Sequence, residues 1–314
     1  MGRRHTRGTD ELAGCLMVLL AATLWGGSGL FVGFLSSAGL TATQYTMVRS
    51  ICAYATILVV VLARDWHSIR VEMKDVPWFI LNGAIGIFAF TLLYATTIQL
   101  TGMATAAVLI YLMPSIVFVY QVLRHRERVS ALRLVCLALS LAGCALVSGV
   151  LSPGTKVVAG GIVMGVIAAI TYAVCNLTQA GPLSKYPTSI VVLHSLGIAM
   201  VLSIVYALLT DDMSAAFAIY ARNPSVLVVN AAFGILCSVV TYLLYNGALR
   251  KIPASQAALL ATFEPVAAAL LGAAFLGQRL DFATVAGIAC EVVALILTQY
   301  AGQRSSLNAE GETE

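Results

Sequence analysis

Long apolar runs alternate with short polar stretches along nearly the whole chain. A transmembrane helix needs about 20 mostly apolar residues, and ten runs reach that length. They span residues 12–35, 41–63, 76–97, 101–121, 129–150, 157–179, 187–210, 224–247, 254–276 and 280–301. The pattern therefore predicts an all-α membrane protein with ten transmembrane helices.

The composition supports this fold class. The chain has 314 residues, of which 60% are hydrophobic and 10% are charged, whereas soluble domains carry about 25% charged residues. The net charge is only +4 and the basic residues gather between apolar runs, so we expect a lipid bilayer and no nucleic acid as partner. The seven cysteines lie inside apolar runs without metal-ligand spacing, so we expect no disulfide, metal or other cofactor.

The distribution of Lys and Arg predicts how the chain crosses the membrane. With the N-terminus in the cytoplasm, 14 of the 18 basic residues fall on the cytoplasmic side, three fall outside, and Arg49 lies within a helix. The positive-inside rule then makes residues 1–11 and 302–314 cytoplasmic tails of a multi-pass protein in the cytoplasmic membrane. The second tail is polar, and we expect it to be disordered.

Two stretches of the chain have identical residues at a constant offset, which indicates an internal repeat. A shift of 151 residues aligns identical residues without a gap: Tyr94 with Tyr245, Ala106 with Ala257, Ala107 with Ala258, Pro114 with Pro265, and Arg128 with Arg279. The chain therefore reads as two five-helix repeats, residues 12–150 and 157–301. Five is an odd number, so we expect the second repeat to be inverted relative to the first, as in many secondary transporters.

Glu264 is the candidate functional residue at the centre of this scheme. It is the only charged residue between Pro253 and Gly277. A charged side chain at bilayer depth costs roughly 2.5–3.5 kcal/mol on insertion scales, so such a residue points to a function by default. The adjacent Pro265 lacks a backbone donor and can open the helix at the same depth.

These residues also resemble a known family. Glu264-Pro265, the alanines at 267–269 and the closing LGQRL are similar to the EamA-type domain of the drug/metabolite transporter superfamily, as is LWGGS at residues 24–28. The first copy has Met113-Pro114 and keeps Glu127-Arg128, and the second has Gln278 where the family often has Glu. The resemblance implies ten helices around a central cavity, with the fifth and tenth at the periphery, and export of amino acids, metabolites or drugs.

Three further ionisable residues lie inside the apolar runs. Arg49 is at a depth that allows an ion pair with Glu264, a substrate shared with it, or an outward-reaching side chain. His194 is a candidate for proton coupling or a neutral hydrogen-bonding group. Glu291 is a candidate for coupling, for a bond to a neighbouring helix, or for a homodimer contact through the fifth and tenth helices.

Aromatic and uncharged polar residues complete the candidate substrate site. Aromatic rings can stack on a ligand or attract a cation, and polar groups can bind a substrate or join helices. The candidates are Trp25, Ser28, Gln44, Arg49, Tyr94, Tyr111, Tyr172, Asn176, His194, Tyr242, Tyr245 and Glu264.

The leading hypothesis is a secondary transporter that exports a small metabolite, such as an amino acid, by alternating access. Efflux of lipophilic cations is the alternative. An intramembrane enzyme would need a clustered nucleophile and base or a set of metal ligands, which the sequence lacks. A passive channel usually needs a ring of pore residues. There is no Gly-rich phosphate-binding loop ending in Gly-Lys, so we do not expect ATP as a direct energy source.

Overall fold

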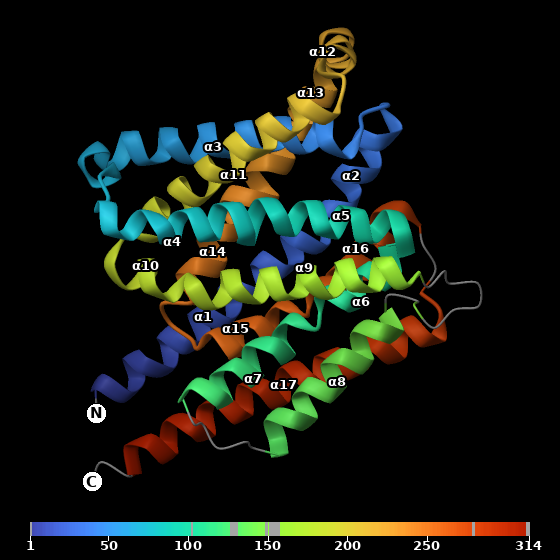
Figure 1. Ribbon diagram of the computed structural model, residues 1–314. Helices are drawn as coiled ribbons and strands as arrows, with labels where there is room; N and C mark the ends of the chain where they lie inside the picture. Colours follow the sequence, from blue (N-terminus) through green and yellow to red (C-terminus); the bar gives the residue numbers. More distant parts are fainter. Residues whose placement is uncertain are drawn as a thin grey trace.

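The computed structural model describes residues 2–101, 103–125, 131–147, 150, 158–277 and 280–311, and this part of the chain is helical without strands (Figure 1). Eight helical segments are long and apolar enough to cross a membrane. The remaining two apolar runs coincide with shorter helices, Leu134–Val147 and Phe282–Leu297. The protein is thus a multi-pass helical bundle, and the count of ten spans stays a prediction.

The helices follow the apolar runs, but several are broken. In chain order they are α1 (Gly2–Gly26), α2 (Ser28–Ser37), α3 (Ala42–Asp65), η1 (Trp66–Ile69), η2 (Met73–Asp75), α4 (Val76–Ile80), η3 (Leu81–Ala89), α5 (Phe90–Thr101), α6 (Met103–Ile110), α7 (Met113–His125), α8 (Ala131–Val147), α9 (Ala159–Thr178), α10 (Ala180–Lys185), α11 (Thr188–Thr210), α12 (Met213–Arg222), α13 (Pro224–Gly234), η4 (Ile235–Val240), α14 (Thr241–Ala248), α15 (Ala254–Ala261), α16 (Glu264–Leu276) and α17 (Phe282–Gly311).

The irregular positions recur at the repeat offset. The break between α6 and α7 falls at residues 111–112, and that between α15 and α16 falls at residues 262–263, which is 151 residues later. The π-helical segments η3 and η4 end at Ala89 and Val240, again 151 apart. Each broken helix resumes with a proline in its first turn, Pro114 or Pro265, where a missing backbone donor costs nothing. The two halves therefore share local geometry as well as sequence.

Helices α3 and α11, the second helices of the two halves, lie side by side and run in opposite directions. At one end of the α3–α11 pair, Gln44 donates to Asp211 Oδ1 at 3.2 Å and to the Asp212 carbonyl at 2.9 Å. At the other end, Lys185 Nζ is 2.5 Å from Asp75 Oδ2. Gln44 near the start of α3 thus meets residues that follow α11, and Lys185, just before α11, meets Asp75, which follows α3. We call these contacts the Asp211 tie and the Asp75 tie.

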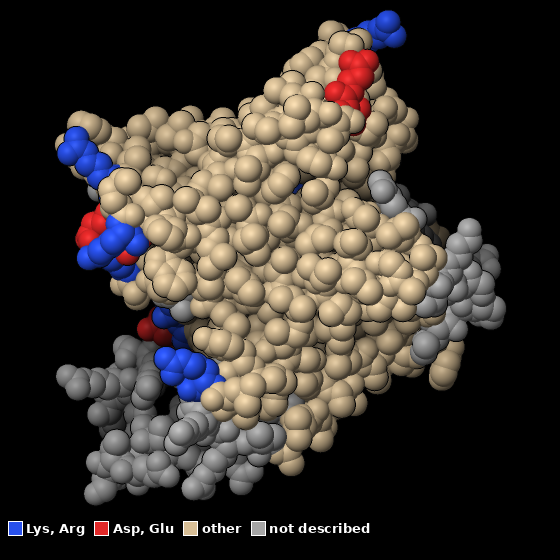
Figure 2. Space-filling view, viewed as in Figure 1, with Lys and Arg blue, Asp and Glu red and all other residues tan. Residues whose placement is uncertain are grey.

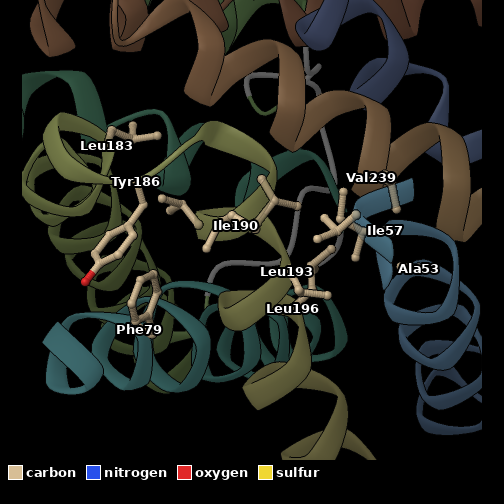
Figure 3. Close-up of a cluster of buried hydrophobic side chains, with 12 residues drawn as sticks. Ala53, Ile57, Phe79, Leu183, Tyr186, Ile190, Leu193, Leu196 and Val239 are labelled. Carbon is tan, nitrogen blue, oxygen red and sulfur yellow. The ribbon is translucent and has the colours of Figure 1, made fainter. Parts of the chain in front are cut away.

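A continuous apolar core holds α3, α4 and α11 together. Its buried side chains include Ile57 from α3, Phe79 from α4 and Leu193 from α11, with Val239 from η4 against them (Figure 3). Burial of such side chains excludes water from the helix contacts. The bundle is therefore packed between the two ties and not only joined at its ends.

Charged residues lie at the margins of the bundle. Figure 2 shows Lys, Arg, Asp and Glu at the left edge and near the tip of α12, with a broad uncharged face between them. Exposed apolar side chains such as Val59, Val201 and Val228 belong to the described surface. An uncharged band between charged rims is what a protein inserted in a bilayer presents to lipid.

The terminal segments differ from the expectation. Helix α1 begins at Gly2 and α17 continues to Gly311, so both proposed tails include helix, and the predicted disorder after residue 303 is wrong as far as Gly311. The reason is that Glu, Arg, Gln and Ala favour helix, and a polar sequence can extend a helix that apolar residues have started.

Glu127, Arg128, Gln278 and Arg279 lie outside the described residues.

Candidate functional site

Glu264 is the first residue of α16, directly after the break in the ninth apolar run. Its carboxylate interacts electrostatically with Tyr111, which stands at the equivalent break of the first repeat. The end of α1 closes over the break: a Cβ placed on Gly26 would lie 2.6 Å from the Glu264 carbonyl oxygen. The end of α1 and the two helix breaks thus meet around Glu264.

A first aromatic group lies beside Glu264. The Phe90 ring stacks on Tyr172 with 4.7 Å between centroids and on Tyr94 with 5.9 Å. Tyr94, Tyr111 and Tyr172 all interact electrostatically with the Glu264 carboxylate. Tyr111 is buried, whereas Glu264, Tyr94 and Tyr172 keep intermediate exposure although they lie deep in the bundle. These three side chains are therefore only partly covered by the rest of the bundle.

A second aromatic group borders the same break. Trp25 lies 6.0 Å from Tyr242 and 5.5 Å from Tyr245 between ring centroids. The buried Asn176 donates its amide to the Tyr245 hydroxyl, and its own oxygen has no partner in the described structure. Four of the predicted site residues therefore come together from α1, α9 and α14.

Arg49 does not form the ion pair that its depth allows. Its Nε donates to Ser238 Oγ at 3.0 Å, and its guanidinium lies 4.4 Å from the centroid of the Phe233 ring. Among the described residues no ion pair joins Arg49 to Glu264. Both charges interact electrostatically with Cys237, which places them in the same region of the bundle. Arg49 and Glu264 thus provide one cationic and one anionic side chain that are not paired with each other.

Gln44 and His194 form contacts elsewhere in the bundle. The Gln44 amide belongs to the Asp211 tie and to the capping box that starts α3. His194 Nε2 is 2.9 Å from the Ile69 carbonyl, and its ring packs at 5.1 Å from Phe79. These contacts fit the alternative role of a hydrogen-bonding group. Ser28 is the first residue of α2, beside the break in the first run.

Glu291 is fully buried between helices of the same chain. Its carboxylate accepts from Ser140 Oγ at 3.2 Å, Cys144 Sγ at 2.8 Å and Thr262 Oγ1 at 3.1 Å. This agrees with a bond to a neighbouring helix. The face of α17 that carries Glu291 packs on α8 within the chain, so a homodimer contact through these helices, which stays a prediction, would need other faces.

Sequence reasoning missed the residues that complete these groups. Phe90 and Phe233 had no feature that separated them from packing aromatics, and Ser238 and Thr262 are common in membrane helices. Thr262 carried one usable signal, its place two residues before Glu264. No group of His, Cys, Asp and Glu in the described ranges could hold a metal ion.

Comparison with known proteins is consistent with this architecture. The model of the EamA-like transporter family matches residues 12–149 and 159–300. The uncharacterized transporter YwfM of Bacillus subtilis (strain 168) is 26% identical over 293 residues, covering 92% of this chain and 94% of that protein. The uncharacterized inner membrane transporter YicL of Salmonella typhimurium is 26% identical over 84% of this chain and 87% of that one. A crystal structure with 20% identity shares the fold, with a TM-score of 0.75 over 93% of this chain and 98% of that chain. The matched segments cover both halves of the chain, which therefore belongs to the EamA-like transporter family.

Proposed function

We propose that the protein is a secondary transporter that exports small metabolites carrying both an amine and a carboxylate, such as amino acids, across the cytoplasmic membrane. The observation that carries the proposal is the separation of Arg49 from Glu264 within one region of the bundle. A zwitterionic substrate can contact both charges, with its amine at Glu264 and its carboxylate at Arg49. An arginine is suited to a planar carboxylate because its guanidinium presents several donors in a fixed geometry.

Alternating access between two inverted five-helix repeats is the proposed mechanism. It is supported by the recurrence of helix breaks 151 residues apart and by the opposite directions of α3 and α11. Discontinuous helices near a repeat interface are where secondary transporters bind their substrates. Both termini are proposed to lie in the cytoplasm, following the Lys and Arg distribution.

Efflux of lipophilic cations is a second candidate, and a specific observation favours it. Glu264 lies among Tyr94, Tyr111 and Tyr172, and an acidic group among aromatic rings attracts a cation. Arg49 distinguishes the two candidate functions, because a cationic substrate is not attracted by a positively charged guanidinium.

Counterflow in proteoliposomes tests both candidates. Vesicles are loaded with an unlabelled amino-acid mixture and given labelled amino acids one at a time, at two pH values. We expect saturable uptake that Glu264→Gln abolishes and Arg49→Ala strongly reduces, while the surface control Glu72→Gln retains it. Tetraphenylphosphonium transport that survives Arg49→Ala would instead support cation efflux. Absence of saturable uptake for every amino acid, or uptake unaffected by Glu264→Gln, would contradict the main proposal.

A further inference from the structure

Glu291 is a buried carboxylate that the substrate scheme does not use. It has no exposed surface, and its side chain lies between α8, α17 and the break that precedes α16. In the described part of the chain no Lys, Arg or His contacts it. The titratable groups near its cluster are the Cys144 thiol on α8, with Tyr111 and Glu264 at the two helix breaks. An ionised carboxylate without a nearby cation is costly at this depth.

The hydrogen bonds around Glu291 depend on whether it carries a proton. Thr262 has one hydroxyl proton and two acceptors in range, the Leu259 carbonyl at 2.6 Å and Glu291 Oε2 at 3.1 Å. An ionised Glu291 is acceptor-only and draws this proton away from Leu259. A protonated Glu291 can donate to Thr262 Oγ1, and the Thr262 proton then returns to the Leu259 carbonyl. Ser140 Oγ lies 2.8 Å from Thr262 Oγ1 and can serve either arrangement.

Thr262 connects the protonation state of Glu291 to the substrate site. It is one of the two residues in the break between α15 and α16, and Glu264 follows two positions later. Its bond to Leu259 completes the last turn of α15, whereas its bond to Glu291 holds the break against α17. Proton binding at Glu291 therefore changes what holds the helix end that presents Glu264.

We propose that Glu291 is a proton-binding positioning residue that controls the break before α16 through Thr262, and thereby regulates the Glu264 site. The inference rests on the proposed function only in taking Glu264 as part of the transport site. Substrate itself does not touch Glu291, because the side chain is enclosed by Ser140, Cys144 and Thr262.

The test uses Trp25 as a reporter and needs no substrate. Trp25 packs against the cluster that contains Leu260 and Ala261, immediately before the break. The full chain carrying Trp66→Phe and Trp78→Phe keeps Trp25 as its single tryptophan, and it is studied in lipid nanodiscs. Glu264→Gln is added so that Glu264 cannot contribute to the signal. We expect Trp25 fluorescence in this background to titrate with pH.

Adding Glu291→Gln should abolish the titration, and Glu291→Asp should shift its midpoint. Thr262→Val should abolish it as well, whereas Thr262→Ser, which keeps the hydroxyl, should restore it. If Glu291→Gln fails to give a monodisperse protein, the Thr262 pair still decides the question. A titration that persists in Glu291→Gln or in Thr262→Val, or that is absent from the Glu264→Gln background, overturns the proposal. Because no transport is measured, a failed counterflow experiment and a failed titration are distinguishable.

Discussion

Ser140 donates a hydrogen bond to Glu291, and the two residues are 151 positions apart in the chain. This separation is also the offset between the broken helices of the two halves. The contact joins α8 to α17, where Gly143 and Gly287 let the backbones approach: a Cβ on Gly287 would lie 2.8 Å from the Gly143 carbonyl oxygen. Small residues at a helix contact allow such packing in membranes. The last helices of the two halves, α8 and α17, therefore pack against each other.

Ser140→Ala is expected to lower the stability of this contact. It removes a donor from a buried carboxylate, and an unsatisfied buried polar group costs about 1–3 kcal/mol. The thermal unfolding midpoint of the purified protein in detergent should fall. Ser184→Ala is the matched control, because Ser184 Oγ donates to the Gly181 carbonyl of its own helix at an exposed site. Equal midpoints for the two variants would show that the Ser140 bond adds nothing.

Gly26→Ala is expected to impair transport by pushing α1 away from the start of α16. The new methyl group would lie 2.6 Å from the Glu264 carbonyl oxygen and 2.8 Å from the Ala268 nitrogen. Backbone atoms cannot move aside as a flexible side chain can. Gly29→Ala, in the adjoining helix α2, meets nothing within 4 Å and serves as the control. We expect counterflow to drop severalfold in the first variant and to stay near wild type in the second.

Arg49→Lys is expected to weaken substrate binding although it keeps the charge. An ammonium cannot both donate in the plane of a guanidinium and stack on Phe233. We expect the KM for an amino-acid substrate to rise about tenfold, which corresponds to about 1.4 kcal/mol. Arg64→Lys, at the exposed end of the same helix, should leave KM unchanged. A KM in Arg49→Lys equal to that of wild type would remove Arg49 from the binding scheme.

Glu72, which pairs with Lys185 beside the Asp75 tie, predicts a pH-dependent contribution to stability. Lys185 and Lys74 hold the pKa of the Glu72 carboxyl below its usual value through charge-assisted hydrogen bonds. A carboxyl whose pKa is lowered by folding stabilises the folded state above its unfolded pKa of about 4.3, and the contribution is lost as pH falls through the folded pKa. Glu72→Gln should therefore lower the unfolding midpoint at pH 7, with a smaller difference in acid.

Lys185→Ala provides the control for the Glu72–Lys185 pair. In that background Glu72 loses its principal partner, so Glu72→Gln should change the unfolding midpoint less at pH 7. A difference between the wild type and the Glu72→Gln variant that is the same at every pH would mean that the charge of Glu72 does not stabilise the fold. The pair is partly exposed and is expected to weaken in high salt.

The all-helical membrane fold and the positions of the helix breaks could be read from the amino-acid sequence. Apolar runs of membrane-spanning length indicate helices because lipid leaves backbone groups no other partner. The offset between Pro114 and Pro265 predicted equivalent halves, and the helix breaks do recur at that offset. Glu264 beside Pro265 predicted an opening of the helix at that depth, and the break lies immediately before it.

Only the tertiary structure showed which side chains contact each other across the bundle. Arg49 meets Ser238 and Phe233 instead of Glu264, and Gln44 is used in the Asp211 tie. A local pattern gives the depth of a side chain along its helix. The rotation of that helix and the neighbour it faces follow from packing between segments far apart in the chain, so only the assembled bundle decides which polar groups meet.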